Sequence, residues 1–270
     1  MTMAVKLLVV GGGRMGGALV SGLLAAGWAN PAEIAVLEPA PERREGLLSA
    51  HPGLLVWERP EPGSVSEDGG AVLAVKPDIA ELACASIAPT RAPRVLSIVA
   101  GMSTERLEAA LPPETVVVRA MPNTPVLVGA GVSAISGGIR AHAADLAWAE
   151  EILSAVGTVV RLPEHMLHVV TGLSGSGPAY VFLVAEALIE AGILGGLSRE
   201  VSRELVVGTL LGSSKLLAES GEPPEALRAD ITSPAGTTAA GLRTLEAKAV
   251  RSAFLEAVAA ATERSRQLGH

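Results

Sequence analysis

The chain has 270 residues, of which 49% are hydrophobic, 18% charged and 2% aromatic, and it carries a formal net charge of −7. This apolar composition excludes an intrinsically disordered chain and supplies a core for one large or two small domains. The negative charge argues against nucleic acid and anionic membrane surfaces as partners, because both attract clusters of Lys and Arg.

Short apolar strands alternate with helical patterns in the first part of the chain. The predicted strands are Val5–Val10, Ile34–Leu37, Leu54–Trp57, Ala71–Val75, Val95–Val99, Val116–Arg119, Val132–Ser136 and Thr158–Leu162. Helices are predicted at Arg14–Ala26, Pro41–Ala50, Asp78–Ile87, Thr104–Ala110 and Ala141–Ala155. Strands that are apolar at nearly every position are typical of a parallel sheet covered by helices on both faces. The sequence therefore predicts an α/β domain of the doubly wound Rossmann type over residues 1–162.

Strand signals stop after Leu162, and the remaining residues show helical patterns only. The predicted helices are Glu164–Leu173, Pro178–Gly192, Ser198–Ser220, Pro224–Ala229, Pro234–Glu246 and Lys248–Leu268. Ser198 and Ser233 are expected at N-cap positions, with Pro234 as the first helical residue. We predict an all-helical second domain over residues 163–270.

The helix expected at Ser198–Ser220 carries Gly208 and Gly212 four residues apart. Small residues at this spacing let two helix backbones approach closely. The close approach lies either between two copies of the chain, in a tightly interleaved homodimer, or within one chain. The two interpretations are equally open from the spacing.

The sequence indicates neither export nor a membrane span. One cysteine, Cys84, excludes an internal disulfide, and the first residues resemble a strand and not a signal peptide. The apolar stretch Tyr180–Leu197 is interrupted by Glu186 and Glu190, which argues against a span. We expect a soluble, cytoplasmic protein without a membrane partner.

The segment Gly11-Gly12-Gly13-Arg14-Met15-Gly16 matches G-x-G-x-x-G between a strand and a helix. In this pattern the first glycine permits the turn, the second lets the backbone approach a pyrophosphate, and the third allows close helix packing. The pyrophosphate accepts hydrogen bonds from amides at the start of the helix. Glu38 ends the second strand roughly 20 residues further on, where an acid binds a ribose diol. These residues predict a site for NADH or NADPH.

The same region leaves the choice between the two cofactors open. Glu38 favours NADH, because its carboxylate repels a 2′-phosphate. Arg43 and Arg44 offer that phosphate a counter-charge, although arginines on a helix are more often simply solvated.

Two later segments place small and hydroxyl residues ahead of a helix that is expected to start with proline. They are Ser174–Pro178 and Ile231–Thr238. Each directs backbone amides and hydroxyls at the space before its helix, which suits a carboxylate without an arginine. Simple helix capping accounts for one such segment. Two of them, in a chain that binds a dinucleotide, indicate a small anionic substrate.

Groups that neutralise an alkoxide are missing from these motifs. None of the five histidines lies in a glycine- or hydroxyl-rich segment, and no Cys, His or Asp cluster has the spacing of metal ligands. Reduction of a ketone usually requires a strong acid or a metal, whereas a protonated imine is already positive. The sequence thus favours reduction of a carbon–nitrogen double bond with no metal.

Four segments resemble the signatures of pyrroline-5-carboxylate reductases, in that family's order and spacing. They are Val72–Pro77, Arg119–Pro125, Leu173–Tyr180 and Thr232–Thr238. The resemblance implies NAD(P)H-dependent reduction of 1-pyrroline-5-carboxylate to L-proline, the last step of proline biosynthesis. It also implies a Rossmann domain followed by a helical dimerisation domain, in homodimers that often assemble further.

The glycine motif and the resemblance together give the residues expected at each ligand. Those expected to hold the dinucleotide are Gly11, Gly13, Arg14, Met15, Gly16, Glu38, Ala74, Val75, Lys76, Pro77, Ala100, Gly101 and Asn123. The resemblance implies that the loop Ser233–Thr238 meets the nicotinamide of the other subunit. In that arrangement Ser233, Gly236 and Thr237 hold the substrate carboxylate, and Thr238 is the catalytic residue that contacts the ring nitrogen and relays its proton.

The chain departs from the family pattern at three places. Ala235 stands where a glycine is usual, and His168 replaces a customary aspartate. An asparagine that usually contacts the adenosine is absent from Val56–Ser64.

Two alternative functions are kept. One is a related NAD(P)-dependent imine or 3-hydroxy-acid reductase with the same two-domain fold. A catalytic lysine in the helical domain would favour it. Lys215 and Lys248 are the lysines there. The other is a non-catalytic paralogue that binds NAD(P) as a regulatory module.

Overall fold

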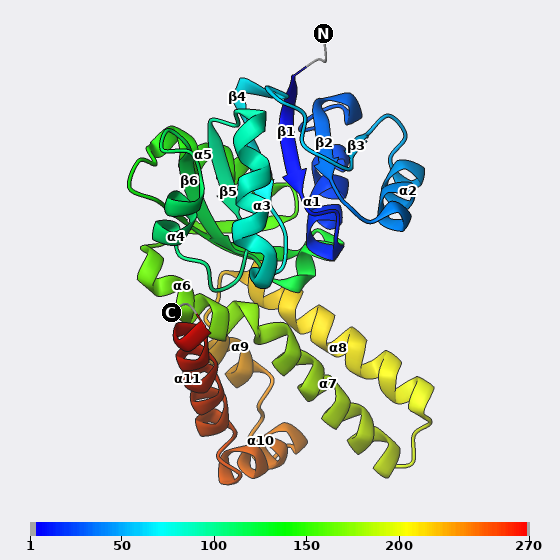
Figure 1. Ribbon diagram of the computed structural model, residues 1–270. Coiled ribbons are helices and arrows are strands. Elements are labelled where there is room, and N and C mark those ends of the chain that lie inside the picture. Colours follow the sequence, from blue (N-terminus) through cyan, green and yellow to red (C-terminus); the bar gives the residue numbers. More distant parts are fainter. Residues whose placement is uncertain (1–3, 269–270) are drawn as a thin grey trace. The chain divides into compact units, whose positions relative to one another are not determined.

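The computed structural model describes residues 4–268, and its first part is built on one eight-stranded sheet. The strands are β1 (Val5–Val10), β2 (Ile34–Leu37), β3 (Leu55–Trp57), β4 (Val65–Leu73), β5 (Arg94–Ser97), β6 (Val116–Met121), β7 (Gly131–Gly137) and β8 (Gly157–Arg161). Their order in the sheet is β3-β2-β1-β4-β5-β6-β7-β8, with β1 between β2 and β4 (Figure 1). All neighbours pair in parallel except β6 and β7. The doubly wound Rossmann-type fold is confirmed.

Helices cover both faces of this sheet, as the apolar strands require. They are α1 (Arg14–Ala25), α2 (Pro41–Ala50), α3 (Ala80–Ile87), α4 (Thr104–Ala110) and α5 (Ala143–Ser154). Successive side chains of β1 point to opposite faces of the sheet. Leu7 belongs to the core formed with α1 and α5, and Leu8 to the core formed with α3 and α4. The sheet is therefore packed on both faces, and this packing holds the ends of its strands in place.

Strand β4 differs from the prediction, since it begins at Val65 and not at Ala71. The segment Ser66–Gly70 resembles a loop because it is polar and rich in glycine. It is nevertheless part of the strand, with a register shift against β1 between Val5 and Leu7. Regular pairing with β1 resumes at Gly70, opposite Leu7, so Ser66–Gly69 form an irregular part of the strand.

The last strand ends at Arg161, and helices make up the rest of the described chain. They begin with the short helix η5 (Glu164–Met166), α6 (Leu167–Val170) and a π-helical turn, η6 (Thr171–Gly175). The longer helices are α7 (Gly177–Leu194), α8 (Arg199–Ser220), α9 (Pro224–Asp230), α10 (Thr237–Ala247) and α11 (Val250–Leu268). The all-helical second part is confirmed.

The chain divides into two compact units. The first comprises residues 1–176 and 260–270, and the second comprises residues 177–259. This division differs from a boundary after residue 162, because η5 and α6 pack with the sheet and the end of α11 contacts α6. His168 and Ser265, for example, are joined by a contact of 3.1 Å between Nδ1 and Oγ. The functional division at 162/163 stays a prediction.

In the second unit, α7 and α8 run side by side as an antiparallel pair (Figure 1). Ser198 caps α8, as predicted, by accepting a hydrogen bond from the amide of Val201 at 3.2 Å. The helices are in close contact where Gly192 faces Ser202, because a Cβ on Gly192 would lie 2.6 Å from the Ser202 Oγ. A Cβ on Gly208 or Gly212 would meet no atom within 4 Å. The two glycines thus make no close approach within the described chain, which favours the interpretation that a second chain packs there.

Apolar side chains cover the surface of these helices. None of the 18 residues of α7 is buried, and Phe182, Leu183 and Leu194 are 63%, 65% and 89% exposed. By length and composition the stretch Glu164–Leu194 is apolar enough to cross a membrane. Length and composition alone do not make it a span, so the expectation that this stretch does not cross a membrane stays a prediction.

Candidate active site

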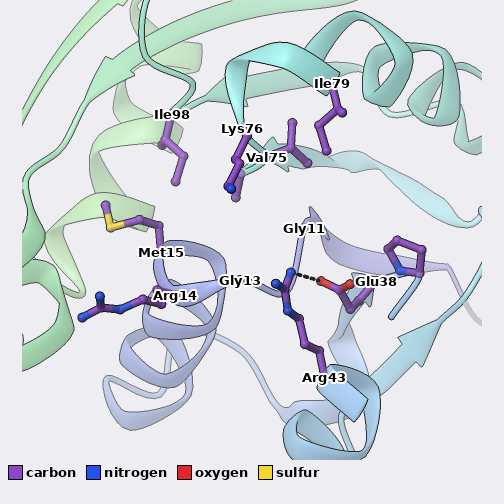
Figure 2. A pocket seen from close by; sticks show the side chains of 12 residues that line it. Gly11, Gly13, Arg14, Met15, Glu38, Arg43, Val75, Lys76, Ile79 and Ile98 are labelled. Atoms are coloured by element: carbon purple, nitrogen blue, oxygen red, sulfur yellow. Dashed lines mark ion pairs between the residues drawn. The ribbon is translucent and has the colours of Figure 1, made fainter. Parts of the chain in front are cut away.

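A pocket of about 500 Å³ opens at the carboxyl ends of the central strands. Eight of the residues predicted to hold a dinucleotide line it: Gly11, Gly13, Arg14, Met15, Glu38, Ala74, Val75 and Lys76. They come from the β1–α1 turn, the end of β2 and the end of β4, and Figure 2 shows them around one opening. Parallel strands present their carboxyl ends at one edge of a sheet, which is where α/β proteins bind ligands.

The glycines of the first turn have different roles. Gly11 has φ of +106° and a Cβ there would lie 2.6 Å from the carbonyl oxygen of Ala74, so the fold itself needs glycine. A Cβ on Gly16 would clash with the carbonyl oxygen of Gly11. Gly13, in contrast, has an ordinary extended conformation and open space around its Cβ position. The protein alone does not require Gly13, which borders the pocket, and this fits a turn shaped for a pyrophosphate.

Glu38 is held rigidly at the end of β2. Its Oε2 accepts a hydrogen bond from the amide of Gly12 at 3.0 Å, and its Oε1 accepts one from the amide of Ala40 at 2.9 Å. Nη1 of Arg43 lies 3.7 Å from Oε2, the ion pair drawn in Figure 2. The acid therefore also organises the glycine turn, a role that the sequence spacing does not reveal.

The other predicted cofactor residues do not line this pocket. Pro77 opens the short helix η2 (Pro77–Ile79), directly after Lys76. Ala100 and Gly101 follow β5, and Gly101 has φ of +77° beside the carbonyl oxygen of Leu268. Asn123 is buried and binds the backbone, since its Oδ1 accepts from the amide of Val132 at 2.9 Å and its Nδ2 donates to the carbonyl of Ser174 at 3.2 Å. Asn123 thus fastens the π-helical turn to the sheet.

Sequence reasoning missed three further lining residues and undervalued a fourth. Pro39, Ile79 and Ile98 line the pocket, and so does Arg43. Each lies within a few residues of a strand end, so the rule that strand ends meet at one edge is the signal that finds them. Arg44 is engaged elsewhere, because its Nη1 donates to the carbonyls of Glu38 and Pro39.

The predicted substrate residues lie in the second unit, at the start of α10. Ser233 was expected as the N-cap with Pro234 as the first helical residue, and this is wrong: Gly236 is the N-cap and Thr237 begins the helix. The amide of Gly236 donates to the carbonyl of Ser233 at 3.0 Å, which closes a turn ahead of the helix. Ala235 sits in this turn with φ of +60°, a conformation that glycine adopts more easily.

This turn leaves the candidate hydroxyls in different surroundings. Ser233 and Thr237 are exposed, and Thr238 is half-buried. A Cβ on Gly236 would clash with the hydroxyl of Ser233 and lie 3.1 Å from its carbonyl oxygen, so a side chain there would have to displace that hydroxyl. Ala235 thus adopts a positive φ in which a side chain is strained and a glycine would not be.

The segment Ser174–Pro178 contains the start of α7, at Gly177. It lies where the π-helical turn η6 passes into α7, and the amide of Ser176 donates to the carbonyl of Thr171 at 2.8 Å. The π-turn thus already uses the amide of Ser176, and an anion site at this segment stays a prediction.

A charged cluster joins the sheet to the first residues of the helical part. Glu164 accepts hydrogen bonds from the amide and hydroxyl of Thr104, at 2.7 and 2.5 Å, and from Nη1 of Arg119 at 2.8 Å. Burial alone would raise the pKa of Glu164, but these bonds outweigh it and hold the pKa below the ordinary value of 4.5. Glu164 is therefore ionised at neutral pH.

Comparison with known proteins shows to which family of two-domain dinucleotide-binding proteins the chain belongs. Residues 164–268 match the domain family described as "Pyrroline-5-carboxylate reductase dimerisation", and residues 6–101 match "NADP oxidoreductase coenzyme F420-dependent". Over 268 residues the chain is 42% identical to the pyrroline-5-carboxylate reductase of Synechocystis, with 99% of both chains covered. The chain belongs to the pyrroline-5-carboxylate reductase family.

Solved pyrroline-5-carboxylate reductases have the same fold. The structure from Coxiella burnetii has a TM-score of 0.91 at 31% identity, with 99% of both chains covered. The Plasmodium falciparum structure, determined with NADP bound, has a TM-score of 0.83 at 32% identity, with both chains covered fully. The prediction of an NAD(P)H-dependent oxidoreductase acting on a carbon–nitrogen double bond is thereby confirmed at the level of the family.

The chain also has a cysteine and side chains of the types that bind metal ions. Burial raises the pKa of the Cys84 thiol to about 11, so it is protonated at neutral pH. Within residues 4–268, no group of three or more His, Cys, Asp or Glu side chains is placed to hold a metal ion.

Proposed function

We propose that the chain reduces 1-pyrroline-5-carboxylate to L-proline with NADH or NADPH. The observation that carries the proposal is the similarity to pyrroline-5-carboxylate reductases over the whole chain, together with a pocket lined by the predicted dinucleotide residues. When bound, the nicotinamide supplies the hydride that reduces the imine carbon.

The glycine turn and its neighbours provide the cofactor site in this proposal. Gly13 leaves room for the pyrophosphate, and the start of α1 offers its free amides and the positive end of the helix dipole. Arg14 and Lys76 line the same pocket and add positive charge for a dianionic ligand. Asn123 acts by positioning, because both ends of its amide bind the backbone.

The loop before α10 provides the substrate site. Ser233 and Thr237 have exposed hydroxyls, and the free amides at the start of α10 complete a carboxylate site with Gly236. The half-buried hydroxyl of Thr238 binds the ring nitrogen, which carries the proton that makes the imine carbon electrophilic. A threonine hydroxyl is a weak acid, so it orients the ring and relays a proton from solvent.

The assembly is part of the proposal. The exposed apolar faces of α7 and α8, and the open space beside Gly208 and Gly212, suit burial against a second copy of the chain. The match of residues 164–268 to a dimerisation domain supports this burial in place of a membrane. We propose a homodimer at least, in the cytoplasm, and further assembly of dimers. Light scattering at micromolar concentration should show no folded species of 27.4 kDa.

A spectrophotometric assay tests the activity. Purified chain is mixed with 1-pyrroline-5-carboxylate and either NADH or NADPH, and the absorbance of the reduced nicotinamide is followed while proline is measured. Turnover of a 3-hydroxy acid or an acyclic imine in place of pyrroline-5-carboxylate would favour the related reductase. Dinucleotide binding without turnover of any of these would favour the regulatory paralogue.

A further inference from the structure

The Glu38 carboxylate cannot turn away from the pocket without cost. Its side chain is only 4% exposed, and each oxygen accepts a hydrogen bond from a backbone amide, Gly12 on one side and Ala40 on the other. Rotation would leave two part-buried amides unpaired, and the cost of an unpaired amide rises to about 1–3 kcal/mol when it is fully buried. Any ligand that reaches this end of the pocket therefore meets a fixed negative charge.

The remaining hydrogen-bonding capacity of Glu38 suits hydroxyl donors. An ionised carboxylate only accepts hydrogen bonds and has about four acceptor positions, of which the two amides use two. An adenosine ribose with free 2′ and 3′ hydroxyls offers two donors. In a ribose with a 2′-phosphate, the 2′-hydroxyl donor is replaced by phosphate oxygens, which are acceptors and carry negative charge.

Arg43 is the counter-charge, and it is much less constrained than Glu38. Its Nη1 lies 3.7 Å from the Glu38 Oε2, and its side chain is 63% exposed. An exposed guanidinium is screened by water and salt and moves among rotamers, whereas a buried carboxylate is screened little. Arg44 is held by backbone carbonyls, so it does not add to Arg43.

We propose that Glu38 makes this chain prefer NADH to NADPH and that Arg43 limits the penalty on NADPH. The inference rests on the proposed dinucleotide-dependent reductase function and specifies its cofactor. A charge repulsion at a few ångströms near the surface, partly offset by Arg43, should favour NADH by on the order of ten- to a hundredfold in affinity.

Titration of the full-length chain with each reduced dinucleotide, without substrate, tests the inference through nicotinamide fluorescence or calorimetry. Glu38→Gln removes the charge and keeps the size, so it should move the affinity ratio towards NADPH by about tenfold or more. Arg43→Ala should weaken NADPH and leave NADH within about twofold, which moves the ratio the other way. Glu42→Gln is the matched control, because Glu42 is an exposed carboxylate beside Arg43 that is not among the pocket-lining residues. It should leave both affinities unchanged.

The outcomes separate this inference from the proposed function. Equal affinities in the parent chain, or an unchanged ratio in Glu38→Gln, would overturn the preference while the reductase proposal stands. Binding of neither dinucleotide to the folded parent chain would overturn the reductase proposal itself. Where Glu38→Gln loosens the Gly12 turn, both affinities fall but their ratio still moves, and Glu38→Asp, which keeps the charge, should keep the preference for NADH.

Discussion

The two compact units of the chain differ in where their apolar side chains lie. Among residues 4–268, every buried hydrophobic side chain lies between Val5 and Leu167, in the first unit. In the second unit the apolar residues of α7 and α8 face outward, and Ser202 is a buried residue between the two helices. The first unit thus carries its own core, and its pocket is formed by strand ends that this core fixes. The second unit presents surfaces that a further chain must cover.

The sharpest test of this difference is a charge on α8. Leu211 is 71% exposed and lies one turn from Gly208, so Leu211→Glu should place a carboxylate in each half of the dimer interface. We expect dissociation to be favoured by about a thousandfold or more, because burying unpaired like charges costs several kcal/mol. Light scattering should report a smaller particle or loss of the folded second unit. Leu211→Met is the control, since it keeps the apolar volume. An unchanged mass and melting temperature for Leu211→Glu would show that this face is not covered.

Two glycine variants in the first unit separate a glycine needed to bind the dinucleotide from a glycine needed for folding. Gly13→Val should weaken dinucleotide binding by about a hundredfold or more without changing the melting temperature, because its Cβ position is open and its φ is ordinary. Gly16→Val should instead destabilise the unit, because its Cβ meets the carbonyl oxygen of Gly11. Calorimetric titration and thermal melts measure both effects. Full affinity in a folded Gly13→Val chain would place the cofactor elsewhere.

The catalytic role of the second unit is tested at Thr238. Loss of one transition-state hydrogen bond costs on the order of 1–3 kcal/mol, so Thr238→Ala should lower kcat by about ten- to a hundredfold. Affinity for NAD(P)H should remain, and Thr238→Ser should restore most of the rate. Thr244→Ala on the same helix removes a hydroxyl that bonds the carbonyl of Ala240, and it should leave kcat unchanged. Parent-like turnover by Thr238→Ala would reduce Thr238 to a feature of the helix start.

The smallest expected effect concerns Glu164 and acid stability. Because its pKa is lower in the folded chain than its ordinary value of 4.5, its ionised form contributes stability above that pH, and the contribution is lost as pH falls through the folded pKa. Glu164→Gln should cost about 2 kcal/mol of unfolding free energy near pH 7, and the difference from the parent should shrink below about pH 4.5. Denaturant melts at several pH values measure this, with the exposed neighbour Glu105→Gln as control. A pH-independent difference would assign the loss to packing and not to charge.

Local pattern was sufficient for most of the architecture. The strands around Gly11–Gly16 and Glu38 follow from apolar runs that only a two-sided sheet can bury, and the turn follows from glycine spacing. The family followed from motifs of the same local kind. For the same reason Ser198 was identified as a cap, since a cap is an interaction between residues three apart.

Long-range contacts decided what local pattern could not. Ser66–Gly69 belong to β4 although they have no register partner on β1, where pairing resumes at Gly70, and the amide of Ser176 is used by the π-turn ahead of α7. Similar reasoning applies to the arginines after β2, which look alike in sequence. Arg43 lines the pocket and Arg44 binds carbonyls, since one helix directs neighbouring side chains to different surroundings.

The sequence by itself determined the fold class, the dinucleotide turn and the family, because each depends on residues close together in the chain. Tertiary structure decided that Glu38 is locked by the amides of Gly12 and Ala40 and that Asn123 supports the sheet in place of lining the pocket. It also decided that the apolar residues of α7 stay exposed. Each polar group makes only a few hydrogen bonds, and each side chain has only a few neighbours. In these cases the partners are distant in the sequence, so they are fixed only when the chain has folded.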